Sequence, residues 1–535
     1  MQFPYFYFGA RYHPEWYPHD AALLEEDAAL MKSLHMNAVI ISASAVHYVI
    51  GLGGGYSWLS GIISRLGENG IDSVVEVPDP LPPVDILRRL NEDGFVRFFM
   101  VCSEKAGKAL QTIRALRAVG IEKEVCVRVK EQALFTSEAC VREADMISTG
   151  FNLDRKTDEG ELIRKAAFLL DRARSVKKDS FILTDIDPAH VRFGTTVKLK
   201  RNGLLSEEIF QAVTHGAKGC FFREFRQAVS GEQRYEGAVI AHSGRTDTRT
   251  FLEIEQVGRL LGELSELALA GNRSRCAVIC GDDSMRADAF RAYTALRTQG
   301  IGVDVLEGSE SFAGYSFVIS FGMRRVSERV AAEIRSYIEK GGIWLAGWGF
   351  ATEDAEGNCF TGDVPHALTD VFGIRIQETE GLEADEEIPL TTAADFKGHF
   401  TSRRICEIPE NLDADVVIKY DRDFFRGRPA LSRKQFGQGF AYYLATDCPD
   451  TLMGMLYDKI LNNLKPDARV RMIEGIAVQR LSGEDAEYLV FQNFTDKEKR
   501  LLLDYNKLDI LFGYDPVPVS GMFVLRVPRQ KKERV

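Results

Sequence analysis

The fold class follows from the run Tyr5-Phe6-Tyr7-Phe8-Gly9-Ala10-Arg11-Tyr12 and from Ala38-Val39-Ile40-Ile41-Ser42-Ala43-Ser44, which comes after it. Both runs are apolar and rich in aromatic or β-branched residues, which is typical of buried strands. Residues 22–35, between them, have the spacing of an amphipathic helix. A strand, a helix and a second strand form the unit from which parallel sheets are built. This stretch therefore predicts an α/β fold with a parallel sheet.

The same alternation continues to about residue 270, with helical patterns between the apolar runs. Eight strand–helix units in a segment of this size are typical of a closed (β/α)8 TIM-type barrel. We therefore expect a barrel over residues 1–271, with its chemistry at the carboxyl ends of the strands. The six further strand runs are residues 73–77, 96–102, 124–129, 144–149, 181–185 and 219–224.

Two smaller domains are expected after the barrel. A polar, glycine-containing linker at 270–274 precedes alternating strands and helices over 272–468, which predict a doubly wound, flavodoxin-like α/β domain. The pattern becomes irregular between 375 and 450. Alternating strands over 469–528 predict a small antiparallel β domain, and the charged residues 529–535 predict a disordered tail.

Composition excludes several functional classes. The chain has 535 residues, of which 45% are hydrophobic and 27% charged, as in ordinary globular proteins. The formal net charge is −11, from 67 basic and 78 acidic residues, so nucleic acid is not an expected partner. From the sequence pattern we expect no secretory leader and no membrane span. We therefore expect a cytoplasmic protein.

The nine cysteines are scattered without the spacing of a zinc site. Cys276 and Cys280 are close enough to share a metal ion, but Cys-Ala-Val-Ile-Cys has the pattern of a buried strand. We expect reduced core thiols and no metal or other cofactor.

Several motifs resemble the glycoside hydrolase family 42 β-galactosidases. The most specific is the run His242-Ser243-Gly244-Arg245-Thr246-Asp247-Thr248-Arg249, which is similar to the stretch that closes the family's barrel. The matching segments cover nearly the whole chain and occur in the same order as in the family. The resemblance implies that this chain is a shortened and divergent member of the family. It implies a barrel acting on β-galactosides, an α/β domain that forms trimers, and a small β domain. The other matching segments are residues 11–18, 24–31, 211–217, 226–227, 235–239, 334–342, 436–439 and 489–496.

The resemblance also suggests a catalytic pair. Retaining hydrolysis needs two carboxyl groups about 5–5.5 Å apart, and the family carries its acid/base after strand four and its nucleophile after strand seven. Glu104, preceded by Ser103 where the family has Asn, matches the acid/base. Asp185 matches the nucleophile. Under another alignment, residues 92–94 belong to a loop before the family's strand four, and that strand is then absent here.

Both assignments have structural alternatives. Glu104 also suits a helix N-terminus, where a negative charge is favourable, and Asp185 also suits a turn at a strand end. Aspartate is one methylene shorter than the family's glutamate, which withdraws the carboxylate by about 1.5 Å. A larger distance between the two carboxyl groups favours an inverting reaction or no reaction.

A sugar pocket is implied around the ends of strands one and eight. By the resemblance, the family's acidic residue and histidine that bind galactose fall on Gln233 and Glu236, and its aromatic platform falls on Phe225. His13 and Trp16 follow the first strand and either stack on a sugar face or pack under their loop.

New charges stand beside this pocket. Arg223, Glu224 and Arg226 form either an internally satisfied ion-pair cluster or a site for an acidic or polar ligand. Residues 40–44 are apolar or small where the family carries an arginine and a glutamate. The family's zinc-binding cysteine cluster has no counterpart here.

Two functions follow from these patterns. The first is a β-galactosidase-like hydrolase of intracellular carbohydrate metabolism, acting on a β-galactoside or a related unusual glycoside, with Glu104 as acid/base and Asp185 as nucleophile or base. The second is a catalytically inactive descendant that binds carbohydrate or acts as a trimeric scaffold. In both cases we expect a homotrimer with the sugar site near the subunit interface.

Overall fold

The structure is a computed structural model. Contacts divide the chain into two compact units, Met1–Asn272 with Val478–Val535, and Arg273–Ala477. The predicted tail lies outside the described residues except for Arg529. The structure describes residues 4–51, 55–103, 105–136, 139–151, 159–178, 180–193, 196–272, 274–281, 286–308, 311–392, 396–463, 475–501 and 508–529.

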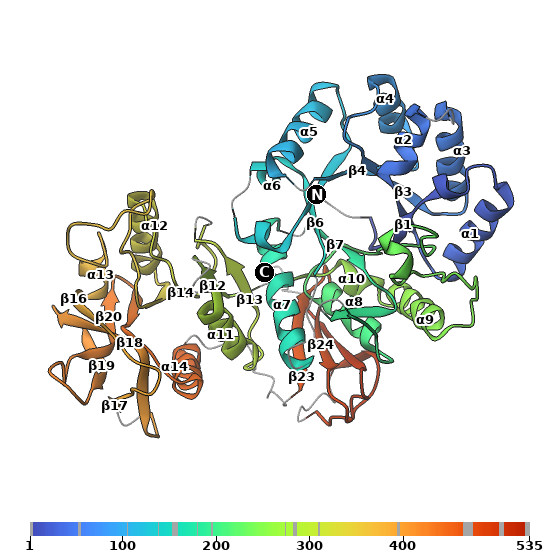
Figure 1. Cartoon of the computed structure of the whole chain (residues 1–535). Coiled ribbons are helices and arrows are strands. Elements are labelled where there is room, and N and C mark those ends of the chain that lie inside the picture. Colours follow the sequence, from blue (N-terminus) through green and yellow to red (C-terminus); the bar gives the residue numbers. More distant parts are fainter. Residues whose placement is uncertain are drawn as a thin grey trace, which may run out of the picture. The chain divides into compact units, whose positions relative to one another are not determined.

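The first unit contains a closed barrel of eight parallel strands (Figure 1). Each of the eight predicted apolar runs forms one of its strands, so the barrel is confirmed. Strand four is present and pairs with both of its neighbours, which removes the alternative that it is missing. In barrel order the strands are β1 (Tyr7–Tyr12), β2 (Ala38–Ile41), β3 (Asp72–Val77), β4 (Val96–Cys102), β5 (Glu124–Val129), β6 (Met146–Thr149), β7 (Phe181–Ile186) and β10 (Gly219–Phe222).

The barrel is packed on both sides of its wall. Phe98, Met100 and Phe221 belong to the apolar cluster that fills the interior, and helices surround the strands (Figure 1). Strands buried on both faces are predominantly apolar, which is why the sequence pattern identifies them so clearly. The surrounding helices are α1 (Ala21–Ser33), α2 (Ala43–Gly51), α3 (Gly55–Glu68), α4 (Val84–Glu92), α5 (Ala106–Ala118), α6 (Ala139–Glu143), α7 (Glu159–Val176), α8 (Leu204–Thr214), α9 (Arg249–Glu263) and α10 (Ser265–Leu269).

Two local features differ from the expected pattern. The second apolar run ends at Ile41, because the Ser42 hydroxyl accepts a hydrogen bond from the Ala45 amide (3.0 Å) at the start of α2. A hairpin of β8 (His190–Phe193) and β9 (Thr196–Leu199) follows β7.

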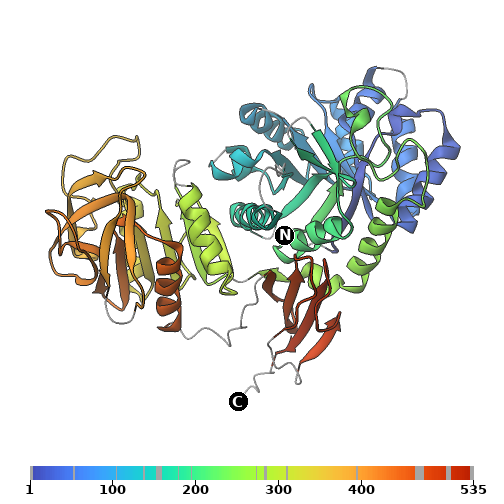
Figure 2. The ribbon, with the colours of Figure 1, turned by 60° about the horizontal axis from the view of Figure 1, so that its bottom comes forward.

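A five-stranded sheet completes the first unit. It packs against the end of α8, where Thr214 donates a hydrogen bond to Gln492 (3.2 Å) and the His215 ring lies 2.6 Å from the Gln479 amide nitrogen. Figure 2 shows this sheet, in red, below green helices of the barrel. The predicted domain limits 469–528 stay a prediction. The strand order is β11 (Gly271–Asn272), β23 (Ile476–Ser482), β24 (Ala486–Asn493), β26 (Met522–Pro528) and β25 (Asp509–Phe512).

The second unit contains the predicted flavodoxin-like sheet. Five parallel strands lie in the spatial order second, first, third, fourth, fifth, which is the flavodoxin order. They are β13 (Val303–Leu306), β12 (Cys276–Cys280), β14 (Phe317–Phe321), β15 (Ile343–Gly347) and β21 (Gly439–Leu444). The helices are α11 (Arg286–Arg297), α12 (Glu328–Glu339), α13 (Thr369–Phe372) and α14 (Asp450–Asn463).

The irregular segment of the sequence extends this sheet with antiparallel strands. Strand β16 (Ile374–Gly381) is mostly exposed, so it carries little of the apolar signal by which a strand is recognised. The other added strands are β17 (Ile388–Thr392), β18 (Phe400–Asn411), β19 (Asp415–Tyr420), β20 (Pro429–Phe436) and the short β22 (Thr446–Asp447).

Cysteine placement agrees with the expected core role at seven of the nine positions, including Cys276 and Cys280 in β12. Cys102 is half-buried and Cys359 is exposed, so the expected core role is wrong for Cys359. Over the described ranges, no group of three or more His, Cys, Asp and Glu side chains is arranged to hold a metal ion. The helices that the structure describes include none that combines the length and the apolarity needed to cross a bilayer.

Candidate functional site

Four alternate strands of the barrel each carry a charged residue one position before their end. These residues are Arg11 of β1, Glu76 of β3, Arg128 of β5 and Asp185 of β7. Arg11 Nη1 lies 3.6 Å from Asp185 Oδ1, and Arg11 Nε lies 3.4 Å from Glu76 Oε2. Arg128 Nη2 lies 2.5 Å from Asp185 Oδ2. Because these strands are not neighbours, the contacts cross the barrel interior, as a layer of side chains from alternate strands does. We call these four residues the charged layer.

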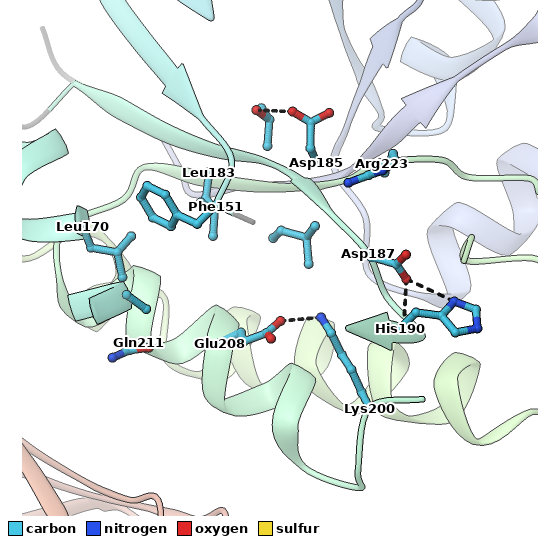
Figure 3. A pocket seen from close by; sticks show the side chains of 13 residues that line it. Phe151, Leu170, Leu183, Asp185, Asp187, His190, Lys200, Glu208, Gln211 and Arg223 are labelled. Atoms are coloured by element: carbon cyan, nitrogen blue, oxygen red, sulfur yellow. Dashed lines mark hydrogen bonds and ion pairs between the residues drawn. The ribbon is translucent and has the colours of Figure 1, made fainter. Parts of the chain in front are cut away.

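A bulge in β7 brings Asp185 into the charged layer. Cys220 pairs with Leu183 and Phe222 pairs with Ile186, so β7 has one residue more than β10 in this stretch. Asp185 has a φ of 59°, in the left-handed region. Bulges redirect side chains and are frequent beside active sites. Figure 3 shows the Asp185 carboxylate pointing away from Lys200 and Glu208, which lie beyond the other side of the strand.

Gly150, directly after β6, leaves the space that Asp185 uses. A Cβ atom at this position would lie 3.2 Å from Asp185 Cβ and 2.7 Å from the Thr184 carbonyl oxygen. The first distance is tight and the second is a clash, so a larger residue here would push against the bulge.

Arg11 is a buried cation within this layer. Only 12% of its side chain is exposed. Burial acts to lower the pKa of Arg11, but the Glu76 and Asp185 carboxylates more than offset this effect, and the pKa is raised. Arg11 therefore remains charged throughout the physiological pH range.

A second cluster of charges surrounds His13. Its Nδ1 lies 2.8 Å from Glu15 Oε1, and its Nε2 lies 2.9 Å from Glu224 Oε2. Burial acts to lower the pKa of His13, but the two carboxylates raise it to about 9. His13 is therefore an imidazolium at neutral pH, and its ring stacks on Trp16. The structure brings His13, Trp16 and Glu224 together, with the Ser42 hydroxyl donating to Glu15 (3.0 Å).

The charged residues after strand eight do not pair with one another. Arg223 pairs with Glu236 (2.5 Å) and Arg226 pairs with Asp27 (2.6 Å). Glu224 pairs with His13 instead. The proposed cluster of Arg223, Glu224 and Arg226 is therefore replaced by three separate pairs, because residues adjacent in an extended segment point to opposite sides.

The remaining predicted site residues have different environments. Phe225 is fully buried and meets the Tyr12 ring edge-on at 6.1 Å between centroids, so it has no open face for a sugar. Gln233 is exposed in the short 3-10 helix Glu232–Tyr235. Glu104 lies outside the described residues, so its separation from Asp185 stays a prediction.

A cavity of about 100 Å³ lies beside β7, and Asp185 belongs to its lining. Lys200 and Glu208, which also line it, lie on the other side of the strand from the Asp185 carboxylate (Figure 3). The polar groups of the cavity form local pairs. Lys200 pairs with Glu208 (2.5 Å), and Asp187 Oδ1 accepts hydrogen bonds from the Ala189 and His190 amides (3.0 and 2.8 Å). The latter contacts show that the Asp187 carboxylate stabilises the turn that follows β7. The apolar lining of the cavity includes Phe151, Leu170, Leu183 and Ile186.

Sequence reasoning assigned no site role to Arg11, Glu76 or Arg128. The last two share one signal. Each is the only charge in the second half of an apolar strand, in Ser73-Val74-Val75-Glu76-Val77 and Val125-Cys126-Val127-Arg128-Val129. A charge that interrupts a strand buried on both faces needs a buried partner. This signal was present in the sequence.

Comparisons with known proteins match both units to one family. Two models of glycoside hydrolase family 42 match the chain, the β-galactosidase model at residues 109–264 and the β-galactosidase trimerisation domain at 281–466. The β-galactosidase BglY of Alicyclobacillus acidocaldarius is 26% identical over 390 residues, which is 68% of this chain and 57% of BglY. LacZ of Lactobacillus acidophilus is 27% identical over 368 residues, 65% of this chain and 55% of LacZ. The alignments thus span little more than half of these relatives.

Solved structures share the fold along nearly the whole chain. The β-galactosidase from Rahnella sp. R3 superposes with a TM-score of 0.85 at 19% identity, covering 99% of both chains. A mutant of Gan42B, a family 42 β-galactosidase from G. stearothermophilus, gives 0.85 at 18% identity, also covering 99% of both chains. The two family models, in the order in which they match, confirm the resemblance read from the sequence: the chain belongs to glycoside hydrolase family 42.

Proposed function

We propose that the chain hydrolyses a β-galactoside or a related glycoside at the mouth of the barrel. The observation that carries this proposal is the placement of the Asp185 carboxylate at the carboxyl end of β7, between the guanidinium groups of Arg11 and Arg128. A carboxylate at a strand end of a barrel is where hydrolytic chemistry is expected. The curated relatives, which are β-galactosidases, support the substrate class.

In this proposal Asp185 and Glu104 are the two catalytic carboxyl groups. For retention, Asp185 forms a bond to the anomeric carbon while the glycosidic C–O bond breaks, and the leaving oxygen takes the proton of Glu104. Water then attacks the glycosyl ester, gives its proton to Glu104 and releases Asp185. For inversion, Asp185 takes the proton of a water molecule that attacks the anomeric carbon directly, and Glu104 again protonates the leaving oxygen.

We also propose that residues 272–468 assemble three copies of the chain, which the match to a trimerisation domain supports. We also propose a cytoplasmic location, which the odd number of cysteines scattered along the sequence supports.

The direct test is incubation of the purified protein with a panel of 4-nitrophenyl glycosides and oligosaccharides. We expect release of sugar from a β-galactoside or a related glycoside, and loss of that activity in Asp185→Asn. Asp145→Asn is the matched control, because Asp145 directly precedes β6 at the other end of the barrel. A panel left intact after long incubation would exclude hydrolysis and leave the inactive binding protein or scaffold.

A further inference from the structure

Two arginines hold the Asp185 carboxylate, one at each oxygen. Arg11 Nη1 lies 3.6 Å from Asp185 Oδ1, and Arg128 Nη2 lies 2.5 Å from Asp185 Oδ2. The two arginines belong to β1 and β5, the strands on either side of β7 in the charged layer. Only 10% of the Asp185 side chain is exposed. Since the residue sits in a bulge with left-handed backbone, its direction depends on these partners as well as on the strand.

Glu76 in turn holds Arg11. Its carboxylate lies 3.4 Å from Arg11 Nε and, at the same distance, accepts a hydrogen bond from the Ala43 amide at the start of α2. The side chains of Glu76 and Arg11 are both 12% exposed. The first amide of α2 thus holds Glu76, which in turn pairs with the Arg11 side chain beside Asp185.

The pair also matters when Asp185 reacts. In both proposed routes Asp185 loses its negative charge, by forming an ester or by taking a proton. Arg11 would then be a buried cation without a counterion, which is strongly unfavourable. Glu76 remains beside it and keeps the cation paired through the reaction. Arg128 needs no such second carboxylate, because 38% of its side chain is exposed to solvent.

We propose that Arg11 and Arg128 are positioning residues for Asp185, and that Glu76 keeps Arg11 paired while the Asp185 charge is consumed. This inference rests on the proposed hydrolysis at Asp185. It assigns roles to three residues of the charged layer, all of which act through Asp185.

The kinetic test uses 4-nitrophenyl β-D-galactoside with Arg11→Met, Arg128→Ala and Glu76→Gln. We expect kcat to fall by about tenfold or more in each, since small displacements of a catalytic group have effects of this size. KM should change by less than about threefold, because the interaction concerns the reacting group rather than substrate binding. Arg97→Met is the matched control, because Arg97 pairs with Asp72 at the start of β3.

Chemical rescue separates positioning from a purely structural role. Guanidinium at millimolar concentration should restore part of the kcat of Arg128→Ala, since the Arg128 side chain is partly open to solvent, and should leave the Arg97 variant unchanged. A kcat within about twofold of wild type in Arg11→Met and Arg128→Ala would overturn the inference, as would a loss carried mainly by KM.

A structural readout covers the case in which the wild type proves inactive. Crystal structures of Arg11→Lys and Arg128→Ala should show the Asp185 carboxylate displaced from its wild-type position. Arg11→Lys retains the buried charge, so it remains available if Arg11→Met does not fold. If the carboxylate keeps its position in both variants, the positioning role is excluded whether or not the protein hydrolyses glycosides. An inactive wild type with a displaced carboxylate would instead contradict the proposed function and the role of Glu76 during the reaction, and would leave the positioning role of the two arginines.

Discussion

The imidazole ring of His13 lies flat against the indole ring of Trp16, with centroids 4.2 Å apart and planes inclined by 8°. Since Glu15 and Glu224 raise the pKa of His13 to about 9, this is a cation over an aromatic face at neutral pH. One face of Trp16 is therefore taken by a side chain of the protein, which leaves only the other for a sugar.

Stability should fall between about pH 6.5 and 9 because of His13. A histidine whose folded pKa exceeds its unfolded value of about 6.5 contributes stability that is full below pH 6.5 and is lost as the pH rises through its folded pKa. The size of this contribution is on the order of 2 to 3 kcal/mol. Urea unfolding of wild type and His13→Gln at pH 6, 7.5 and 9 should show a difference that shrinks with rising pH. His242→Gln, on an exposed loop, is the control, and a difference independent of pH would contradict the prediction.

Asp185→Asn should abolish turnover and leave the fold and ligand binding intact. The amide has nearly the same shape, but it neither attacks an anomeric carbon nor accepts a proton from water. Turnover is measured on the glycoside found for the wild type, and binding of the product sugar by calorimetry. A wild-type rate in this variant would show that strand seven does not supply the chemistry.

Glu104→Gln should remove the basic limb of the pH–rate profile. As general acid, Glu104 must carry a proton, so activity falls when the pH is high enough to remove it. The glutamine variant has no such proton, and its residual rate should be flat over that range. The profile of kcat/KM in wild type and variant decides this, and an unchanged basic limb would assign the acid to another residue.

In the second unit, Glu407 should make stability decrease as the pH rises from about 4.5 to 7. Burial raises the pKa of Glu407 to about 7, and the bonds from the Gly349 amide (2.9 Å) and the Tyr443 hydroxyl (2.8 Å) offset this only in part. A carboxyl with a raised folded pKa binds its proton more tightly when folded, so the folded state loses stability, on the order of 2 to 3 kcal/mol, as the proton leaves.

Glu407→Gln keeps the size of this side chain and has no proton to lose. Unfolding at pH 5 and pH 8 should therefore show a smaller pH dependence in the variant than in wild type. Glu410→Gln, at a half-buried position near the end of the same strand, provides the comparison. An equal pH dependence in wild type and Glu407→Gln would exclude Glu407 as its cause.

The chain should form a homotrimer at micromolar concentration. The trimerisation-domain match covers residues 281–466, and most soluble oligomers are symmetric assemblies of identical chains. Light scattering coupled to size exclusion measures the mass directly. A mass of one chain would contradict this prediction.

The barrel was predictable because its strands are buried on both faces. Phe98-Phe99-Met100-Val101 in β4 has no polar residue to break the apolar signal, so sequence pattern and burial coincide. Strand β16 was missed for the opposite reason, since most of its residues are exposed and three of the eight are charged. Its pairing with β18 is a long-range contact that no local pattern records.

The site was less accessible to sequence reasoning. The placement of Asp185 at the end of strand seven followed from periodicity and resemblance, but its partners Arg11 and Arg128 lie on other strands and meet it only when the barrel closes. The resemblance placed the family's aromatic platform on Phe225. Its ring is instead fully buried against Tyr12, a contact that forms only when strands one and eight come together.

The bulge in β7 also explains which acid suits this position. If β7 paired with β10 without the bulge, Thr184 would lie in the charged layer and Asp185 would face the surrounding helices. The pairing register of β7 therefore decides whether a hydroxyl or a carboxylate lies in that layer. The register present here requires a positive φ, which aspartate and asparagine tolerate better than other residues apart from glycine. A glutamate would reach further but fit this backbone less well. The backbone at this position therefore favours aspartate over glutamate. A glutamate that extended the carboxylate further into the barrel would also require a change in the backbone conformation of β7.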